Sequence, residues 1–295
     1  MDLDSLIIAA FCLVDDTLRR MALPRLRQRG PRPMLADSEV LCLEVVGEYL
    51  GMSRDTEVFA YFRRHYAHFF PALGALHRTT FTRQAANLWR VKEALWQRLL
   101  AQTGCDPAWA MVDSFPIAVC RFARAPRCRA FRGQAGYGRD HSVKQIFYGF
   151  RLHARVCWPG VVTRFSLCAG EVSDVALLEQ LTDQTAGVCL ADRAYWKPEL
   201  HEWLRGCGLE MLVPYKKAGF ESRPARARAI SSIRYRIETV FGQLCERFTT
   251  KRVWARDLWH LSSRLLRKVL SHTAMIILNR AQGNEPLRLA ELLTN

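Results

Sequence analysis

Acidic residues are scarce in this 295-residue sequence, in which 28 Asp and Glu stand against 43 Lys and Arg and leave a formal charge of +15. This shortage excludes an acidic, disordered chain. Nearly half of the residues (49%) are hydrophobic and 11% are aromatic, which is enough for a sizeable packed core. The excess of fixed positive charge points to an anionic partner, and nucleic acid is the commonest one.

Long hydrophobic runs and paired cysteines are also missing. The longest apolar run, residues 6–14, is too short for a bilayer span and lacks the basic start of a signal peptide, so we expect no membrane partner. The ten cysteines include no CxxC pair, which argues against a zinc knuckle. Most lie in apolar stretches, where a reduced cysteine behaves as a small buried hydrophobe, and this predicts a cytoplasmic protein.

Apolar residues at helical spacing predict an all-helical N-terminal domain over residues 1–104. Within it, Ser38 is expected to cap a helix that runs to residue 50, and a glycine-containing break separates that helix from a second one over 55–65. This pattern fits a DNA-binding helix-turn-helix whose arginines contact phosphates. A simple helical hairpin fits it as well, and spacing alone favours the hairpin. The arginines concerned are Arg54, Arg63 and Arg64.

A change of pattern after residue 104 predicts an α/β domain over residues 105–256. Three β-rich segments come first, and helices then alternate with short buried strands, which favours one mixed sheet with helices on both faces. A helical extension over 257–295 is expected to close the chain. The expected strands are 109–121, 146–157, 161–168, 187–192 and 209–213, and the expected helices are 174–185, 197–206, 230–248 and 258–281.

Positive charge is concentrated in two segments of the second half. Residues 121–155 hold nine basic residues against one acid, and residues 216–256 hold eleven against three. Aromatic residues are interleaved with the first segment. A solvated cationic surface explains a single charged run, but two runs with interleaved aromatics favour a nucleic-acid surface.

Three carboxylates stand in apolar or cationic surroundings. Asp113 lies in the first expected strand, Asp192 ends the strand 187–192, and Glu238 lies at the edge of an apolar stripe in the helix 230–248. Taken singly, each has an ordinary explanation: backbone hydrogen bonds for Asp113, a loop cap for Asp192, and an ion pair with Arg234 for Glu238. Taken together, they can converge on one small volume, where their repulsion is relieved by divalent cations. Hard oxygen ligands select Mg²⁺ or Mn²⁺.

Five motifs occur in order along the chain, and three of them contain these carboxylates. They are Val112-Asp113-Ser114-Phe115-Pro116, Cys128-Arg129-Ala130-Phe131-Arg132-Gly133, Tyr148-Gly149-Phe150-Arg151-Leu152-His153, Ala191-Asp192-Arg193-Ala194-Tyr195 and Arg236-Ile237-Glu238-Thr239-Val240-Phe241. With these motifs the sequence resembles the DDE transposases of bacterial insertion sequences, and it is most similar to the insertion sequence 982 family. The resemblance runs over nearly the whole chain.

The resemblance implies a ribonuclease H-like catalytic core with Asp113, Asp192 and Glu238 as catalytic residues and ligands of two Mg²⁺ or Mn²⁺ ions. It implies a transposase that cuts DNA at terminal inverted repeats and joins the resulting 3′ hydroxyls to target DNA. It also implies a homodimer or larger assembly on DNA, in the bacterial nucleoid. Two rival functions are a nuclease of the same fold that does not join strands, and a DNA-binding regulator without catalysis.

Weaker expectations concern DNA contacts. Arg234 matches the arginine of the Tyr-Arg-Glu-Lys signature of related transposases, but Ser231 and Cys245 replace its tyrosine and lysine. Tyr195 is expected either to contact DNA or to pack under the sheet, and His153 is expected to be a core histidine. The remaining candidate DNA-binding residues are Arg132, Lys144, Arg151, Arg236 and Arg247.

Overall fold

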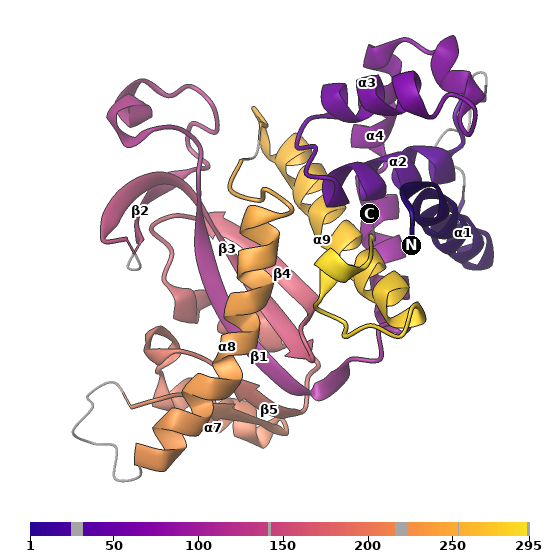
Figure 1. The fold of residues 1–295 in the computed structure, drawn as a ribbon. Helices are drawn as coiled ribbons and strands as arrows, with labels where there is room; N and C mark the ends of the chain where they lie inside the picture. Colours follow the sequence, from indigo (N-terminus) through magenta and orange to yellow (C-terminus); the bar gives the residue numbers. More distant parts are fainter. Residues whose placement is uncertain (25–31, 141–142, 216–223, 253, 294–295) are drawn as a thin grey trace. The chain divides into compact units, whose positions relative to one another are not determined.

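The structure, a computed structural model, describes residues 1–24, 32–140, 143–215, 224–252 and 254–293 (Figure 1). The chain forms two units, one of residues 1–103 with 244–295 and one of residues 104–243. We call them unit 1 and unit 2. No helix in the described ranges is both long and apolar enough to cross a membrane.

Unit 1 is built from helices, as expected for the first hundred residues. Its long C-terminal helix lies with them, because α9 packs against α2 and α5. The chain therefore divides differently from the expected boundaries: the segment 257–295 joins the N-terminal helices instead of forming a separate extension. The helices are α1 (Leu3–Met21), α2 (Asp37–Tyr49), α3 (Asp55–His65), α4 (Arg78–Asn87), α5 (Trp89–Leu100) and α9 (Leu258–Ala281).

Helix α2 is the centre of unit 1, with eleven of its thirteen residues buried. Ser38, the expected cap, is one of the buried residues, and the helix is instead capped at Ala36, whose N–H donates to Glu39 Oε2 (2.6 Å). The phosphate contacts expected of a helix-turn-helix, Arg54, Arg63 and Arg64, lie on α3 or just before it. The burial of α2 therefore does not distinguish the helix-turn-helix from the helical hairpin, and both stay predictions.

A network of buried charges joins α2, α3 and α9. The guanidinium of Arg267, which is 1% exposed, contacts Glu48 Oε1 (2.5 Å), Asp55 Oδ1 (2.5 Å) and Glu44 Oε1 (3.4 Å). Burial alone would lower the pKa of Arg267, but the three carboxylates raise it, so the arginine stays charged. Each buried charge thus meets an opposite one, as buried ions require.

Two buried lysines complete the network. Lys268 donates from Nζ to Glu48 Oε2 (2.7 Å) and to the Phe248 carbonyl (2.7 Å). Lys92 on α5 donates to Glu44 Oε1 (2.8 Å) and to Ser263 Oγ on α9 (3.0 Å). The network therefore ties four helices together, although they are far apart in the sequence.

Unit 2 is organised around a mixed sheet of six strands in the order β2-β3-β1-β5-β6, with β4 paired to β3. The pairs β1–β3, β2–β3 and β3–β4 are antiparallel, whereas β1–β5 and β5–β6 are parallel. Five of the strands match the expected ones. The strands are β1 (Asp106–Ala118), β2 (Gly136–Asp140), β3 (Gln145–Trp158), β4 (Val161–Ala169), β5 (Gly187–Leu190) and β6 (Leu209–Leu212).

Two elements of unit 2 differ from expectation. Strand β2 was not predicted, because its five residues include two glycines and two charged residues and have no apolar alternation. The helix expected over 174–185 is a 3₁₀ turn, η3 (Asp174–Leu177), followed by the short helix α6 (Leu178–Thr182). Helix α7 (Pro198–Gly206) matches its prediction to within one residue, whereas α8 (Pro224–Glu246) begins six residues before the expected start at residue 230.

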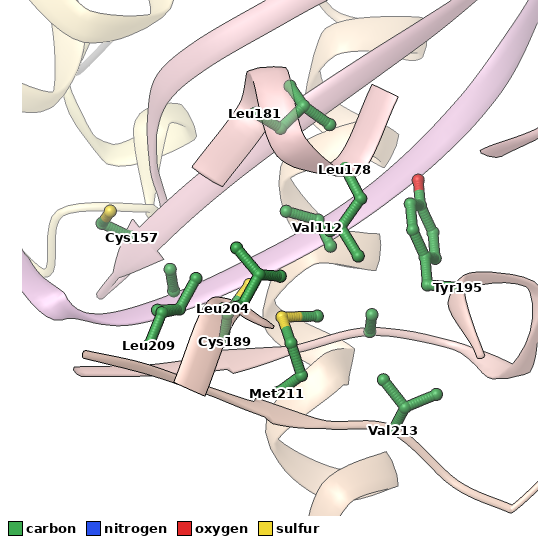
Figure 2. Packing of buried hydrophobic residues seen from close by; sticks show 12 residues of the cluster. Val112, Cys157, Leu178, Leu181, Cys189, Tyr195, Leu204, Leu209, Met211 and Val213 are labelled. Atoms are coloured by element: carbon green, nitrogen blue, oxygen red, sulfur yellow. The ribbon is translucent and has the colours of Figure 1, made fainter. Parts of the chain in front are cut away.

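Alternation along β1 separates the two faces of the sheet. Val112 points into an apolar cluster with Cys189, Leu204 and Met211, which lies under α6 and α7 (Figure 2). Phe115, on the opposite face, packs edge to face against Phe241 of α8 (ring centroids 4.8 Å apart). Because successive strand residues point to opposite faces, Asp113 faces α8 and Ser114 faces the other side.

We expect Arg267→Met to lower the free energy of unfolding by about 3–5 kcal/mol, because it leaves buried carboxylates without a counter-charge. Urea denaturation followed by circular dichroism measures the effect. Arg98→Met, at an exposed position of α5, is the matched control and should change stability by no more than about 0.5 kcal/mol. A loss below about 1 kcal/mol for Arg267→Met would contradict a stabilising network.

Candidate functional site

Asp113 is a carboxylate held in the middle of a buried strand. Its Oδ1 accepts a hydrogen bond from the Ser114 N–H (2.8 Å), and its Oδ2 lies 3.3 Å from Nη2 of Arg234 on α8. The side chain is 19% exposed. Burial, together with the charge of Asp192, raises the pKa of Asp113 to about 6 against the opposing effects of Ser114 and Arg234. Ionisation of Asp113 beside the charged Asp192 is therefore unfavourable unless another positive charge compensates it.

The register of two parallel strands brings Asp192 to the same place. Met111 of β1 is paired with Leu190 of β5. Asp113 and Asp192 each come two residues later, so they lie side by side, just beyond the C-terminal end of β5. Asp192 Oδ1 accepts a hydrogen bond from the Ala194 N–H (2.8 Å) and begins a 3₁₀ turn over 193–195. This is the arrangement that the sequence predicted for the two aspartates.

Glu238, the third predicted acid, is exposed on α8. It lies one helical turn after Arg234 and so shares its face of the helix, but Arg234 is the residue that contacts Asp113. Among the described residues, no three His, Cys, Asp or Glu side chains are grouped closely enough to hold a metal ion. The structure thus brings two of the three acids together, and the role of Glu238 stays a prediction.

Arg234 also carries an unused donor. Its Nε is buried and has no hydrogen-bond partner in the part of the chain that the structure describes. Buried polar groups normally have a partner, so an unpaired N–H beside Asp113 is a position that an acceptor atom of a ligand would satisfy. A phosphate oxygen is such an acceptor.

Behind Asp113, on the other face of β1, lies a polar network that sequence reasoning missed. Ser114 Oγ donates to Asp174 Oδ1 (2.9 Å) and accepts from Arg151 Nη1 (3.2 Å). Arg151 Nε lies 3.7 Å from Asp174 Oδ1. Nothing in the sequence around Asp174 marks it, because only the fold brings η3 against β1 and β3. The network fixes Ser114, whose N–H in turn holds the Asp113 carboxylate.

Tyr195 and His153 belong to the core beneath this network. Tyr195 is fully buried in the apolar cluster (Figure 2), and its hydroxyl lies 3.3 Å from His153 Nδ1. The prediction that Tyr195 contacts DNA is therefore wrong, and the alternative, packing under the sheet, is confirmed. Burial lowers the pKa of His153 to about 4, which keeps it neutral at physiological pH. His153 is the core histidine that the sequence predicted.

The remaining predicted DNA-binding residues fall into three groups. Arg132 and Lys144 are exposed, so they are available to phosphates. Arg236 stacks over the Trp158 ring (5.0 Å to the centroid), and Arg247, in unit 1, stacks over Tyr49 (4.9 Å). Arg151 is 11% exposed and is held by the network behind Asp113. Three basic residues of the segment 216–256, Lys216, Lys217 and Arg223, lie outside the described residues.

The two aspartates fit a hard divalent cation. They supply oxygen ligands, which Mg²⁺ and Mn²⁺ prefer. Burial and the neighbouring Asp192 both raise the pKa of Asp113, so its ionised form is disfavoured, and a cation beside both carboxylates would relieve that cost. The donor chemistry therefore agrees with the predicted ion, and Asp113 and Asp192 are the residues that would hold it.

We expect Asp113→Asn to raise the melting temperature of the metal-free protein at pH 7.5. The pKa of an Asp is about 3.9 in an unfolded chain and about 6 at this site, so ionised Asp113 destabilises the fold above pH 6, and the penalty disappears as the pH falls from 6 to 4. The gain should be about 1–3 kcal/mol at pH 7.5 and vanish near pH 4. Thermal melts across this pH range measure it.

Added Mg²⁺ or Mn²⁺ should raise the melting temperature of the wild type and leave Asp113→Asn unchanged, because the variant lacks the charged ligand. Asp183→Asn, an exposed aspartate of the same unit, should respond to the ions as the wild type does. Equal responses of all three proteins would show that these carboxylates hold no metal.

Comparison with known proteins shows which family the chain belongs to. The family model described as "Transposase DDE domain" matches residues 103–253, a range that contains Asp113, Asp192 and Glu238. No curated protein sequence matches the chain. Among solved structures, the fold is similar to a piggyBac transposase in a synaptic complex with hairpin DNA, with a TM-score of 0.50 and 10% identity over 97% of this chain and 79% of that chain. Because the family model covers more than half of its residues, the chain belongs to the DDE transposase family.

Proposed function

We propose that the chain is a transposase that cleaves the ends of an insertion sequence and joins their 3′ hydroxyls to target DNA. The observation that carries this proposal is the buried carboxylate of Asp113, placed beside Asp192 by parallel strands and held within an otherwise strongly basic protein. Such a pair has little structural value of its own, because its charges repel each other and are costly to bury.

Glu238 completes the site in this proposal. It shares a face of α8 with Arg234, which contacts Asp113, and in this proposal that helix face turns the Glu238 carboxylate toward the aspartates. The three acids would then hold two Mg²⁺ or Mn²⁺ ions, which would supply activation of the attacking oxygen and stabilisation of the departing one. Arg234, with its unused Nε, contacts an oxygen of the reacting phosphate.

Both reaction steps are displacements at phosphorus. In the first, a water oxygen bonds to phosphorus, the bond from phosphorus to the 3′ oxygen breaks, and a 3′ hydroxyl and a 5′ phosphate are left. In the second, this 3′ hydroxyl attacks a phosphodiester of the target, and a target 3′ oxygen leaves and takes up a proton. No covalent protein intermediate is required, so the side chains have only to orient the strands and carry charge.

The finer assignments are part of the same proposal. The five motifs support membership of the insertion sequence 982 family, and the DNA partners are then the terminal inverted repeats of the element and a target duplex. Synapsis of two ends calls for a homodimer or a larger assembly, and DNA bound throughout the cycle places the protein in the nucleoid. Inverted repeats on both sides of the gene would support these assignments.

Asp113→Asn, Asp192→Asn and Glu238→Gln should each reduce Mg²⁺-dependent cleavage of duplexes that carry the flanking inverted repeats by at least about 100-fold, with DNA binding retained. Glu246→Gln, an exposed glutamate on the same helix, is the matched control and should cleave normally. Gel electrophoresis of labelled strands measures cleavage, and fluorescence anisotropy measures binding.

Pre-cut 3′ ends supplied with a target plasmid distinguish the rival functions. Joined products support a transposase, whereas cleavage without joining identifies a nuclease. Unchanged activity in all three acid variants would indicate a DNA-binding regulator without catalysis at this site.

The network behind Asp113 makes a separate prediction. Asp174→Asn keeps a hydrogen-bond acceptor for Ser114 but removes the charge that faces Arg151, so we expect cleavage to fall about 10-fold and to require more Mg²⁺. Mg²⁺ titrations of the cleavage rate measure both effects, with Asp183→Asn as control. An unchanged Mg²⁺ requirement would show that the network has no influence on the metal-binding carboxylates.

A further inference from the structure

Strand pairing stops short of the two candidate aspartates. The pairing of β1 with β5 ends at Met111 and Leu190, and Asp113 and Asp192 each lie two residues beyond it. Backbone hydrogen bonds between these strands therefore do not directly set the distance between the carboxylates. An ion held by both side chains needs a fixed distance, because metal–ligand bond lengths vary by only about 0.2 Å. The distance depends on other contacts.

Tyr195 belongs to the turn that carries Asp192. Its N–H donates to the Asp192 carbonyl (3.1 Å) and closes the 3₁₀ turn that begins there. The side chain is fully buried, and its hydroxyl oxygen points away from Val213 of the apolar cluster (Figure 2). Because packing holds the ring and a backbone hydrogen bond holds the turn, the hydroxyl and Asp192 keep a constant separation.

The hydroxyl of Tyr195 contacts a cross-strand pair of β1 and β3. Ser114 and His153 are directly opposite each other in the antiparallel register, so their side chains stand on the same face of the sheet. The Tyr195 oxygen lies 3.3 Å from His153 Nδ1 and within hydrogen-bonding reach of the Ser114 side chain. His153 Nε2 in turn lies 3.4 Å from Cys168 Sγ on β4 and 3.7 Å from Asp174 Oδ1, so both ring nitrogens have neighbours.

Ser114 connects this hydroxyl to the first aspartate. Its N–H donates to Asp113 Oδ1 (2.8 Å). A continuous path therefore runs from the Asp113 carboxylate through Ser114 and Tyr195 to the turn of Asp192. Burial, together with the charges of Asp174 and the two candidate aspartates, raises the pKa of Tyr195 well above its usual value. The hydroxyl stays neutral and adds no negative charge beside the carboxylates.

We propose that Tyr195 is a positioning residue, whose hydroxyl fixes the distance between the Asp113 and Asp192 carboxylates. The inference rests on the proposed function, since the two-carboxylate site is what needs a fixed distance. A residue that only filled the core here could be phenylalanine, because the apolar cluster makes no use of a hydroxyl. The polar partners of Tyr195 lie on β1 and β3, the strands that carry Asp113 and the network behind it.

Tyr195→Phe tests the hydroxyl, because it keeps the buried ring. Tyr49→Phe is the matched control: Tyr49, in unit 1, is 2% exposed, and its hydroxyl donates to the Leu289 carbonyl (2.7 Å). Electron paramagnetic resonance of free Mn²⁺ measures its binding to the metal-free full chain at pH 7.5. The dissociation constant should rise about 10-fold in Tyr195→Phe, as for other residues that orient metal ligands, and stay at the wild-type value in Tyr49→Phe.

A purely structural role of the hydroxyl gives a different result. Both variants would then melt at lower temperatures and bind Mn²⁺ like the wild type, which would overturn the proposal. Cleavage supplies a second measurement. In Tyr195→Phe the Mg²⁺ concentration for half-maximal cleavage should rise about 10-fold, while the dissociation constant for DNA stays unchanged.

A double variant covers the case in which Tyr195→Phe is unstable. His153→Leu/Tyr195→Phe removes both polar partners, which leaves fewer buried groups unpaired than removing one. Because the two side chains act through each other, the double variant should bind Mn²⁺ about as weakly as expected for Tyr195→Phe. Wild-type affinity for Mn²⁺ in the folded double variant would overturn the proposal.

The outcome is distinguishable from that of the proposed reaction. If no protein cleaves DNA but Tyr195→Phe binds Mn²⁺ more weakly than the control, the reaction fails and the positioning role stands. If the wild type cleaves and joins strands, and Tyr195→Phe matches it in Mn²⁺ affinity and Mg²⁺ requirement, the positioning role fails and the reaction stands.

Discussion

The parallel pairing of β1 with β5 is the constraint on which the site depends. Its register sets Asp113 and Asp192 side by side, two residues beyond the paired Met111 and Leu190. Asp113 then lies on the face covered by α8, where burial and the second aspartate raise its pKa to about 6. A one-residue slip would turn this carboxylate toward the apolar cluster, so the hydrophobic alternation of β1 also protects the chemistry.

Buried charges are paired differently in the two units. In unit 1, Arg267 and two lysines meet three carboxylates at close distances, so charge contributes to holding helices together. In unit 2, Asp113 has a single arginine and a neighbouring aspartate, and its ionised form is disfavoured. Perturbed groups of this kind gather at functional sites. The sparse pairing of Asp113 supports placing the proposed chemistry in unit 2.

Much of the architecture follows from patterns that are local in the sequence. Stretches rich in Val, Phe, Tyr and Ile predicted β1, β3 and β4 to within a few residues, and an apolar stripe predicted most of α8, because these residue types favour buried strands and buried helix faces. Strand β2 was missed, since hydrogen bonds to β3 rather than its own side chains make it a strand. Asp174, on η3, was missed for a related reason, because its partners Ser114 and Arg151 lie far from it in the sequence, on β1 and β3.

The sequence by itself determined which side chains are candidates for the site: three acids in apolar or cationic surroundings within a strongly basic chain. Only the tertiary structure decided which of these side chains meet. In the folded chain Tyr195 is buried in the core, Arg234 rather than Glu238 contacts Asp113, and α9 packs with the N-terminal helices. The physical reason is that residue type and periodicity select a face and an element, whereas contacts between distant elements depend on how whole surfaces pack, and no short stretch of sequence records that.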